Sequence, residues 1–292
     1  MNRIKGILYA AVSSSTFGLA PFFSITLLLA GFSAFEVLSY RWGVASIVLI
    51  VFGWLSGCNF RLAGKDWGVV FLLSLLRAVT SFSLIIAYQN IASGVASTIH
   101  FMYPLAVALA MMFFFREKKS LLVILAVLMS LLGAALLSLG ELEAKSGNTM
   151  VGLVAACVSV FSYAGYIVGV RTTRAVQINS TALTCYVMGL GTIFYLIGAY
   201  CTSGLQLVSD GYTWLIIRGL ALPATAISNI TLVQAIKYAG PTLTSILGAM
   251  EPLTAVVIGV FVFKELFTVN SAVGIILILL AVSIVVFRRQ KS

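Results

Sequence analysis

Residues 87–105 read AYQNIASGVASTIHFMYPL, and residues 235–253 read AIKYAGPTLTSILGAMEPL. An ungapped offset of 148 residues aligns five identical pairs along these stretches: Ala87 with Ala235, Ser97 with Ser245, Met102 with Met250, Pro104 with Pro252, and Leu105 with Leu253. Further on, Glu117 falls on Glu265, and a basic residue precedes each of them. A weaker similarity, at an offset of 146, aligns residues 6–13 with residues 152–159. The chain therefore consists of two related halves.

The composition indicates a membrane protein. Of the 292 residues, 61% are hydrophobic and only 9% are charged, and the mean hydropathy is +1.11. A water-soluble domain cannot bury that much apolar surface. The first hydrophobic run, of about 25 residues, is too long for the core of a signal peptide. The net charge of +10 would suggest a nucleic-acid partner in a soluble protein, but basic loops held at the membrane surface explain it better.

Continuous apolar runs predict transmembrane helices, because lipid admits only helices or closed barrels and the alternation of a barrel strand is absent. Ten spans are expected: residues 5–29, 34–56, 67–88, 91–114, 120–140, 150–170, 180–202, 213–236, 240–262 and 268–287. The polar stretch 141–149 is the expected linker between a first repeat, residues 1–140, and a second repeat, residues 150–292.

Basic residues predict the orientation of these spans. With the N-terminus in the cytoplasm, the inner loops hold 13 of the 18 Lys and Arg residues, and the outer loops hold only Lys145 and Lys264. Both termini are therefore predicted to be cytoplasmic. Because each half has five spans, the second half enters the membrane from the opposite side. We thus predict an all-α membrane protein of two inverted five-helix repeats, with a shared site near the midplane.

The repeated pattern resembles a known family. A small-residue helix with a central proline and a basic-Glu exit occurs twice, ending at Arg116-Glu117 and at Lys264-Glu265. The pattern is similar to the tandem EamA domains of the drug/metabolite transporter superfamily, and Tyr40-Arg41-Trp42 resembles that family's Arg-aromatic pair. The resemblance covers essentially the whole chain. Two departures are Arg77, where small apolar residues are usual, and Tyr186, where the second copy would repeat Arg41.

This resemblance implies a secondary carrier in the cytoplasmic (inner) membrane, which exports amino acids or related small metabolites by alternating access. The rival carrier class is a proton-coupled antiporter of cationic drugs or amines. Such a carrier could use Glu251, but the first span has no acidic residue, unlike the small multidrug carriers that the superfamily resembles.

Two charged residues stand deep inside predicted spans. A charge near the middle of a span costs about 2.5–3.5 kcal/mol on insertion scales, so it persists where it is paired or faces a polar cavity. Arg77 lies in the third span with Ser81 on the same stripe, and Glu251 lies in the ninth span. We expect all three to line a central cavity, where Arg77 binds the carboxylate and Glu251 the ammonium group of a zwitterion. The alternative is a permanent Arg77–Glu251 ion pair that only braces the helices.

The only histidine, His100, shares a helical face with Tyr103, which the repeat superimposes on Glu251. Histidine titrates near neutral pH, so His100 could carry a coupling proton; the alternative is a histidine that only hydrogen-bonds a neighbouring helix. Pro104 and Pro252 are expected to mark equivalent bends, or hinges, because a proline frees the carbonyl one turn earlier, near Gly248 for Pro252.

Spans one, six and eight carry further polar or aromatic stripes. Their candidates for substrate contact are Phe17, Tyr163, Tyr166 and Asn229; helix packing is the alternative for each. Arg41 and Arg218 lie within two turns of the predicted outer boundary. We expect both to extend towards lipid headgroups.

Other classes of function lack their motifs. The sequence contains no P-loop, HExxH or GxSxG, which leaves an ATP-driven pump or a membrane-embedded enzyme unsupported. A channel does not need two exchangeable halves. The four cysteines show no paired spacing, and no metal or cofactor is expected. The expected partners are a small-molecule substrate, coupling protons and the lipid bilayer, with the chain as a monomer or weak homodimer.

Overall fold

The fold is known from a computed structural model that describes residues 2–91, 93–117, 121–138, 147–202, 204–254, 257 and 268–288. Every regular element in these residues is helical. Seven segments are long and apolar enough to cross a membrane: Arg3–Leu29, Ala34–Leu55, Gly64–Asn90, Val95–Phe114, Thr149–Thr172, Ser180–Cys201 and Gly211–Ala239. Two shorter apolar helices, Leu121–Gly133 and Ala272–Ile284, and the start of a further span at Pro241–Leu247 complete the ten-helix fold.

The helices follow the predicted spans in order. The first half contains α1 (Asn2–Phe17), α2 (Ala20–Leu29), α3 (Ala34–Leu55), α4 (Trp67–Asn90), α5 (Ser93–His100), α6 (Tyr103–Phe114) and α7 (Leu121–Ser138). The second half contains α8 (Thr149–Thr172), α9 (Ser180–Cys201), α10 (Gly211–Ala221), the π-helix η4 (Leu222–Ile227), α11 (Ser228–Ala239), α12 (Pro241–Leu247) and α14 (Val269–Arg288). The 3₁₀ turns η1 (Gly64–Asp66) and η3 (Arg174–Gln177) lie in loops.

Side chains cap the first turns of several helices. Ser33 and Glu36 form a capping box at α3, in which each side chain bonds the other's backbone N–H. Asn148, Asn179 and Asp210 accept backbone N–H groups at the starts of α8, α9 and α10. Short polar residues before apolar runs thus begin these helices.

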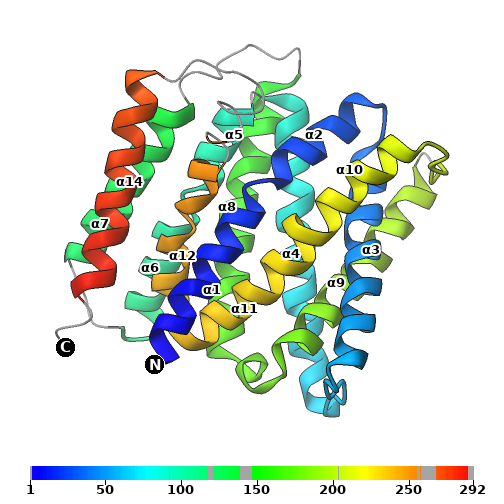
Figure 1. Cartoon of the computed structure of the whole chain (residues 1–292), viewed down its shortest axis with the longest axis horizontal. Helices are drawn as coiled ribbons and strands as arrows, with labels where there is room; N and C mark the ends of the chain where they lie inside the picture. The colour runs from blue at the N-terminus through cyan, green and yellow to red at the C-terminus, as the bar shows by residue number, and fades with distance from the viewer. Residues whose placement is uncertain are drawn as a thin grey trace.

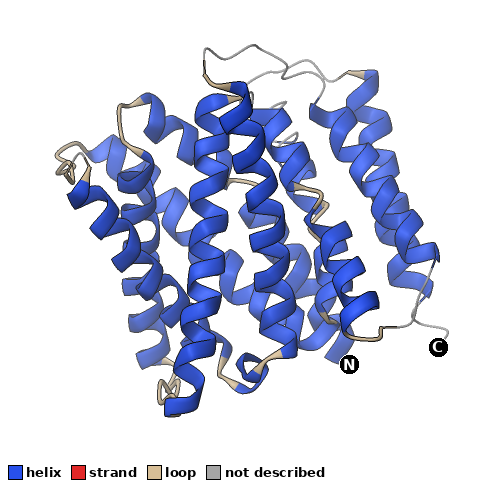
Figure 2. Cartoon of the chain, turned by 180° about the vertical axis from the view of Figure 1, so that it is seen from behind, coloured by secondary structure: helices blue, strands red, loops and turns tan. Residues whose placement is uncertain are grey.

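Helix pairing shows the inverted two-fold arrangement. α1 packs against α11, and the equivalent helices of the other half, α8 and α4, also pack together. The pairs α3–α9 and α7–α14 each join a helix to its own counterpart, and α6–α12 joins the two equivalent spans, four and nine. The N-terminal end of α1 and the C-terminal end of α14 lie at the same end of the bundle (Figure 1). From behind, the loops gather at the two ends of the bundle (Figure 2).

Several spans are interrupted rather than continuous. Span one breaks at Gly18-Leu19 between α1 and α2, and span four breaks at Phe101-Met102 between α5 and α6. Span nine has a turn at residues 248–249, and span eight widens into η4 at Pro223. The breaks in spans four and nine directly precede the segments that contain Pro104 and Pro252.

One detail of the proline expectation is wrong. The carbonyl of Gly248 is not free, because the backbone N–H of Glu251 donates to it at 2.9 Å. Pro252 has no N–H to donate to this carbonyl, and the tighter turn lets the N–H of Glu251 donate to it instead. The predicted linker, 141–149, lies largely outside the described residues, and the boundaries of the two repeats stay a prediction.

Candidate substrate site

Arg77 of α4 lies in the middle of the bundle and is only 1% exposed. Its Nε donates to Oδ1 of Asn229 at 3.0 Å, and its Nη1 donates to Oγ of Ser81 at 3.3 Å. The guanidinium carbon also lies 5.0 Å from the ring centroid of Tyr163 and 5.3 Å from that of Phe17. Aromatic faces and neutral acceptors thus surround this charge.

Arg41 of α3 also points inward, so the expectation that it extends towards lipid headgroups is wrong. The side chain is 4% exposed. Its Nε donates to Oγ1 of Thr225 at 2.6 Å, and its Nη2 donates to the carbonyl of Ala224 at 3.4 Å. Both acceptors belong to η4, and π-helical turns are frequent at functional sites. Arg218, by contrast, is exposed.

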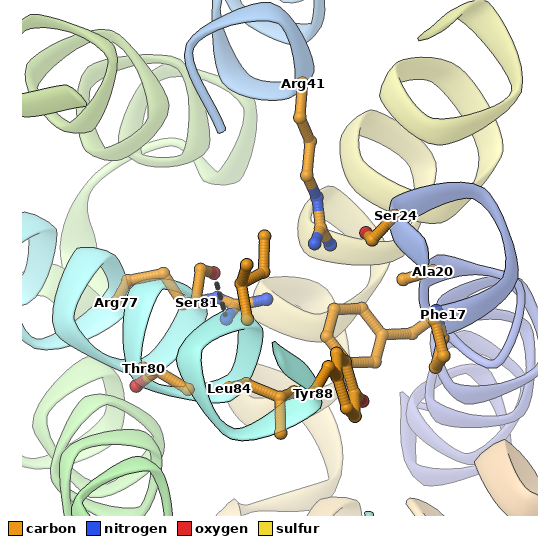
Figure 3. Close-up of a pocket in the computed structure, with 11 residues that line it drawn as sticks. Phe17, Ala20, Ser24, Arg41, Arg77, Thr80, Ser81, Leu84 and Tyr88 are labelled. Atoms are coloured by element: carbon orange, nitrogen blue, oxygen red, sulfur yellow. Dashed lines mark hydrogen bonds between the residues drawn. The ribbon is translucent and has the colours of Figure 1, made fainter. Parts of the chain in front are cut away.

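The two arginines border one cavity. Its lining comes from α1, α2, α3 and α4 and includes Phe17, Ser24, Arg41, Arg77, Ser81 and Tyr88. Figure 3 shows both guanidinium groups directed into the same space beside Phe17. The cavity volume is about 20 Å³, which is room for about one water molecule. The site is therefore contracted in this conformation.

Tyr103 and Glu251 meet beside an aromatic cluster of Phe17, Tyr163 and Tyr166, in which the ring of Tyr163 lies 4.6 Å from that of Tyr103. The hydroxyl of Tyr103 donates to Oε1 of Glu251 at 3.4 Å. Gly248 makes room for this hydroxyl, because a Cβ there would lie 1.8 Å from it. The backbone of Glu251 also crosses closely against Gly18, where a Cβ would lie 2.6 Å from its carbonyl oxygen. The breaks in spans one, four and nine therefore converge at one point.

His100 lies beside this cluster, 4% exposed. Its Nδ1 is 2.8 Å from Oγ of Ser159, and its ring stacks 5.4 Å from Tyr163. Within the described residues, its Nε2 and the hydroxyl of the fully buried Tyr166 have no hydrogen-bond partner. The histidine thus has one polar contact through Nδ1, and its Nε2 is buried without a partner among the described residues.

Arg77 and Glu251 do not form the bracing ion pair that was the alternative reading. No carboxylate oxygen of the described residues lies within 4.0 Å of Arg77. Two rings connect them through successive contacts. The ring of Tyr163 lies 5.0 Å from the guanidinium carbon of Arg77 and 4.6 Å from the ring of Tyr103, whose hydroxyl donates to Glu251. Tyr163 and Tyr103 thus form an aromatic bridge of contacts between the two charged residues, which do not touch each other.

Most of the candidate residues come together around this bridge. Each member contacts another through an interaction given above, except Tyr166, whose ring centroid lies 5.9 Å from the guanidinium carbon of Arg77. The members are Phe17, Arg77, Ser81, His100, Tyr103, Tyr163, Tyr166, Asn229 and Glu251. Arg41 was missed as a site residue, and Thr225 was only a weaker candidate in span eight, with helix packing as its alternative. A usable signal was present, because Thr225 lies one turn before Asn229 on the same stripe.

The residues offer little to a metal ion. In the described part of the chain, no three His, Cys, Asp or Glu side chains are close enough to ligate one together. The arrangement instead provides two cations, one carboxylate, several hydroxyls and apolar rings around a contracted cavity. Such a set binds small polar molecules.

Comparison with known proteins identifies the family. The model of the EamA-like transporter family matches residues 4–139 and 150–287. A protein of Archaeoglobus fulgidus described as an uncharacterized transporter is 28% identical over 238 residues, which cover 80% of this chain and 83% of that protein. A solved crystal structure with 18% identity superimposes with a TM-score of 0.81 over 100% of this chain and 99% of its own.

These matches confirm the predicted family and fold class. The two matched segments account for nearly all of the chain, and the solved structure shows the same fold at low identity. Transport of small molecules across a membrane is the activity that they support. The protein, a multi-pass membrane protein of two inverted repeats, belongs to the EamA-like transporter family.

Proposed function

We propose that this chain is a secondary carrier for a small metabolite with a carboxylate group, such as an amino acid, and that it exports this metabolite by alternating access. The observation that carries the proposal is Arg77, a buried cation at the wall of a central cavity whose hydrogen bonds go to neutral groups. A membrane-embedded charge without a protein counter-charge is typical of a substrate pathway.

Differences between the halves support alternating access. Spans one and eight are interrupted at Gly18-Leu19 and at η4, whereas their counterparts, α8 and α4, run without a break. In a carrier of inverted repeats, each half adopts in turn the conformation of the other, and this exchange moves the opening from one side to the other. The outer segments α2 and α10, which pack together, are then the parts that move.

A second cavity supports entry from the cytoplasm. It measures about 610 Å³ and is lined by Tyr9, Ser56, Asn59, Asn179, Thr231 and Gln234, among others. The loop between α3 and α4, which carries Ser56 and Asn59, lies at the end of the bundle where the N-terminus lies (Figure 1). The basic-residue bias assigns this end to the cytoplasm. The volume of this second cavity falls within the range of ligand pockets, about 300–1,000 Å³, unlike the contracted central cavity.

The rival function, antiport of cationic drugs, is less well supported. Arg41 and Arg77 at one cavity would repel a cation. For the coupling ion we propose a proton, with Glu251 and His100 as the titratable side chains, since both contact Tyr103 beside the site.

The experiment is a screen of the purified protein for thermal stabilisation by amino acids, other carboxylates and organic amines. A ligand that binds the folded state raises the apparent stability by mass action. We expect stabilisation by carboxylates and subsequent exchange of the same compounds in proteoliposomes. Stabilisation and exchange by amines alone would overturn the proposal in favour of the cationic antiporter.

A further inference from the structure

Arg41 and Arg77 form a pair. They come from different helices, α3 and α4, yet their guanidinium carbons lie 5.5 Å and 5.3 Å from the centroid of one ring, Phe17. Both line the same cavity, and both are at least 96% buried. Figure 3 shows the two groups facing the space beside that ring.

No carboxylate of the described residues contacts this double charge directly. The hydrogen bonds of the two arginines go to two hydroxyls, one amide oxygen and one backbone carbonyl. Within the described residues, neither arginine has a carboxylate oxygen within 4.0 Å. Two like charges in a low-dielectric interior repel each other and are both poorly solvated. An anion between them would remove both penalties.

Both guanidiniums also retain hydrogen-bonding capacity. Each has five N–H donors in a planar fork, and the structure gives each of them two acceptors. The planar fork matches the oxygens of carboxylate and phosphate groups bidentately. The ring of Phe17 packs against both guanidinium groups and restricts their rotation. Ser24 and Ser81 add hydroxyls to the same wall.

We infer that this cavity takes a small molecule with two negative charges, a dicarboxylate or a phosphate monoester, held by Arg41 and Arg77 together. The inference rests on the proposed carrier function; a dicarboxylate narrows the carboxylate class proposed above, whereas a phosphate monoester replaces the carboxylate with another dianion. A zwitterion with one carboxylate would neutralise one arginine and leave the other unbalanced. Its ammonium group would also be separated from Glu251 by the rings of Tyr163 and Tyr103.

The test compares three probes in proteoliposomes: succinate as a dicarboxylate, glycerol 3-phosphate as a phosphate monoester, and L-alanine as a zwitterion with one carboxylate. Counterflow gives an apparent affinity for each. In the wild type, we expect one of the dianions to bind at least about tenfold more tightly than L-alanine, and the better dianion identifies the anionic group.

The informative variant is Arg41→Gln, with Arg218→Gln as the matched control, because Arg218 is exposed and its loss changes the net charge equally. We expect Arg41→Gln to weaken dianion binding at least about tenfold and L-alanine binding less than about threefold, whereas Arg218→Gln changes neither. If Arg41→Gln does not fold, Arg41→Lys keeps the charge but loses the bidentate fork, and should show the same selective loss.

The outcomes separate the two claims. Exchange of L-alanine without a preference for a dianion, or an equal effect of Arg41→Gln on every probe, would overturn the dianion inference and leave the carrier function standing. Failure of the wild type to exchange any of the three probes would contradict both.

Discussion

The hydroxyl of Tyr103 donates a hydrogen bond to Glu251, and the internal repeat superimposes these same two residues on each other. Residues related by a two-fold axis can touch only close to that axis. The contact therefore places the pseudo-two-fold axis at the breaks of spans four and nine. Arg77 is joined to this point through Tyr163. The candidate site thus lies where the two halves meet, as expected for a carrier of inverted repeats.

The first prediction concerns the space above Gly248. A Cβ at this position would lie 1.8 Å from the hydroxyl oxygen of Tyr103 and 3.0 Å from its ring carbon Cζ. Tyr103 is 2% exposed and cannot easily move aside. We expect Gly248→Ala to lower the free energy of unfolding by about 1–3 kcal/mol and to reduce transport. Thermal unfolding and counterflow would measure the two effects.

Tyr103→Phe supplies the control for this prediction. The single variant loses one hydrogen bond, worth about 1 kcal/mol. Combined with Gly248→Ala, it removes the closest clash, so the double variant should be more stable than Gly248→Ala alone. An additive loss of stability in the double variant would show that the tyrosine hydroxyl does not occupy this space.

The second prediction concerns the break in span one. A Cβ on Gly18 would lie 2.6 Å from the carbonyl oxygen of Glu251 and 2.8 Å from Cβ of Thr254. We expect Gly18→Ala to separate spans one and nine and to reduce the rate of exchange at least about tenfold. The matched control is Gly189→Ala in α9, where nothing lies within 4 Å and an alanine should stabilise the helix by about 1 kcal/mol. Equal exchange rates in the two variants would exclude a tight crossing at Gly18.

The third prediction concerns topology. The loop between α9 and α10 and the loop between α3 and α4 lie at opposite ends of the bundle (Figure 1). In a cysteine-free background, Leu207→Cys in the first loop should react with an impermeant maleimide added outside intact cells. Ala63→Cys in the second loop should react only after permeabilisation. The reverse pattern would invert the predicted orientation and leave the fold unchanged.

The repeat made most of the fold predictable, because identical pairs at a constant offset imply that two halves share one fold. The environment of Arg41 could not be predicted in the same way. Its depth near the outer boundary suggested the membrane surface, but depth along a helix does not say which neighbour faces a side chain. The neighbour is η4, whose π-helical turn brings Thr225 and Ala224 to the guanidinium. The direct Arg77–Glu251 pair was likewise a reasonable alternative until the rings of Tyr163 and Tyr103 were found between them.

The central claim is that Arg77 holds the substrate and does not brace the fold. Because no carboxylate oxygen of the described residues lies within 4.0 Å of Arg77, Arg77→Gln breaks no direct ion pair and loses hydrogen bonds worth about 1 kcal/mol each. A bracing arginine with a buried acidic partner would instead cost about 3–5 kcal/mol when removed.

The most direct measurement is proteoliposome counterflow of the best-exchanged carboxylate probe by Arg77→Gln, with Arg218→Gln as the control and size-exclusion monodispersity recorded for both. The account predicts that both variants are monodisperse, that Arg218→Gln exchanges the probe like the wild type, and that Arg77→Gln loses at least about a hundredfold in exchange. A monodisperse Arg77→Gln variant with undiminished exchange would contradict it.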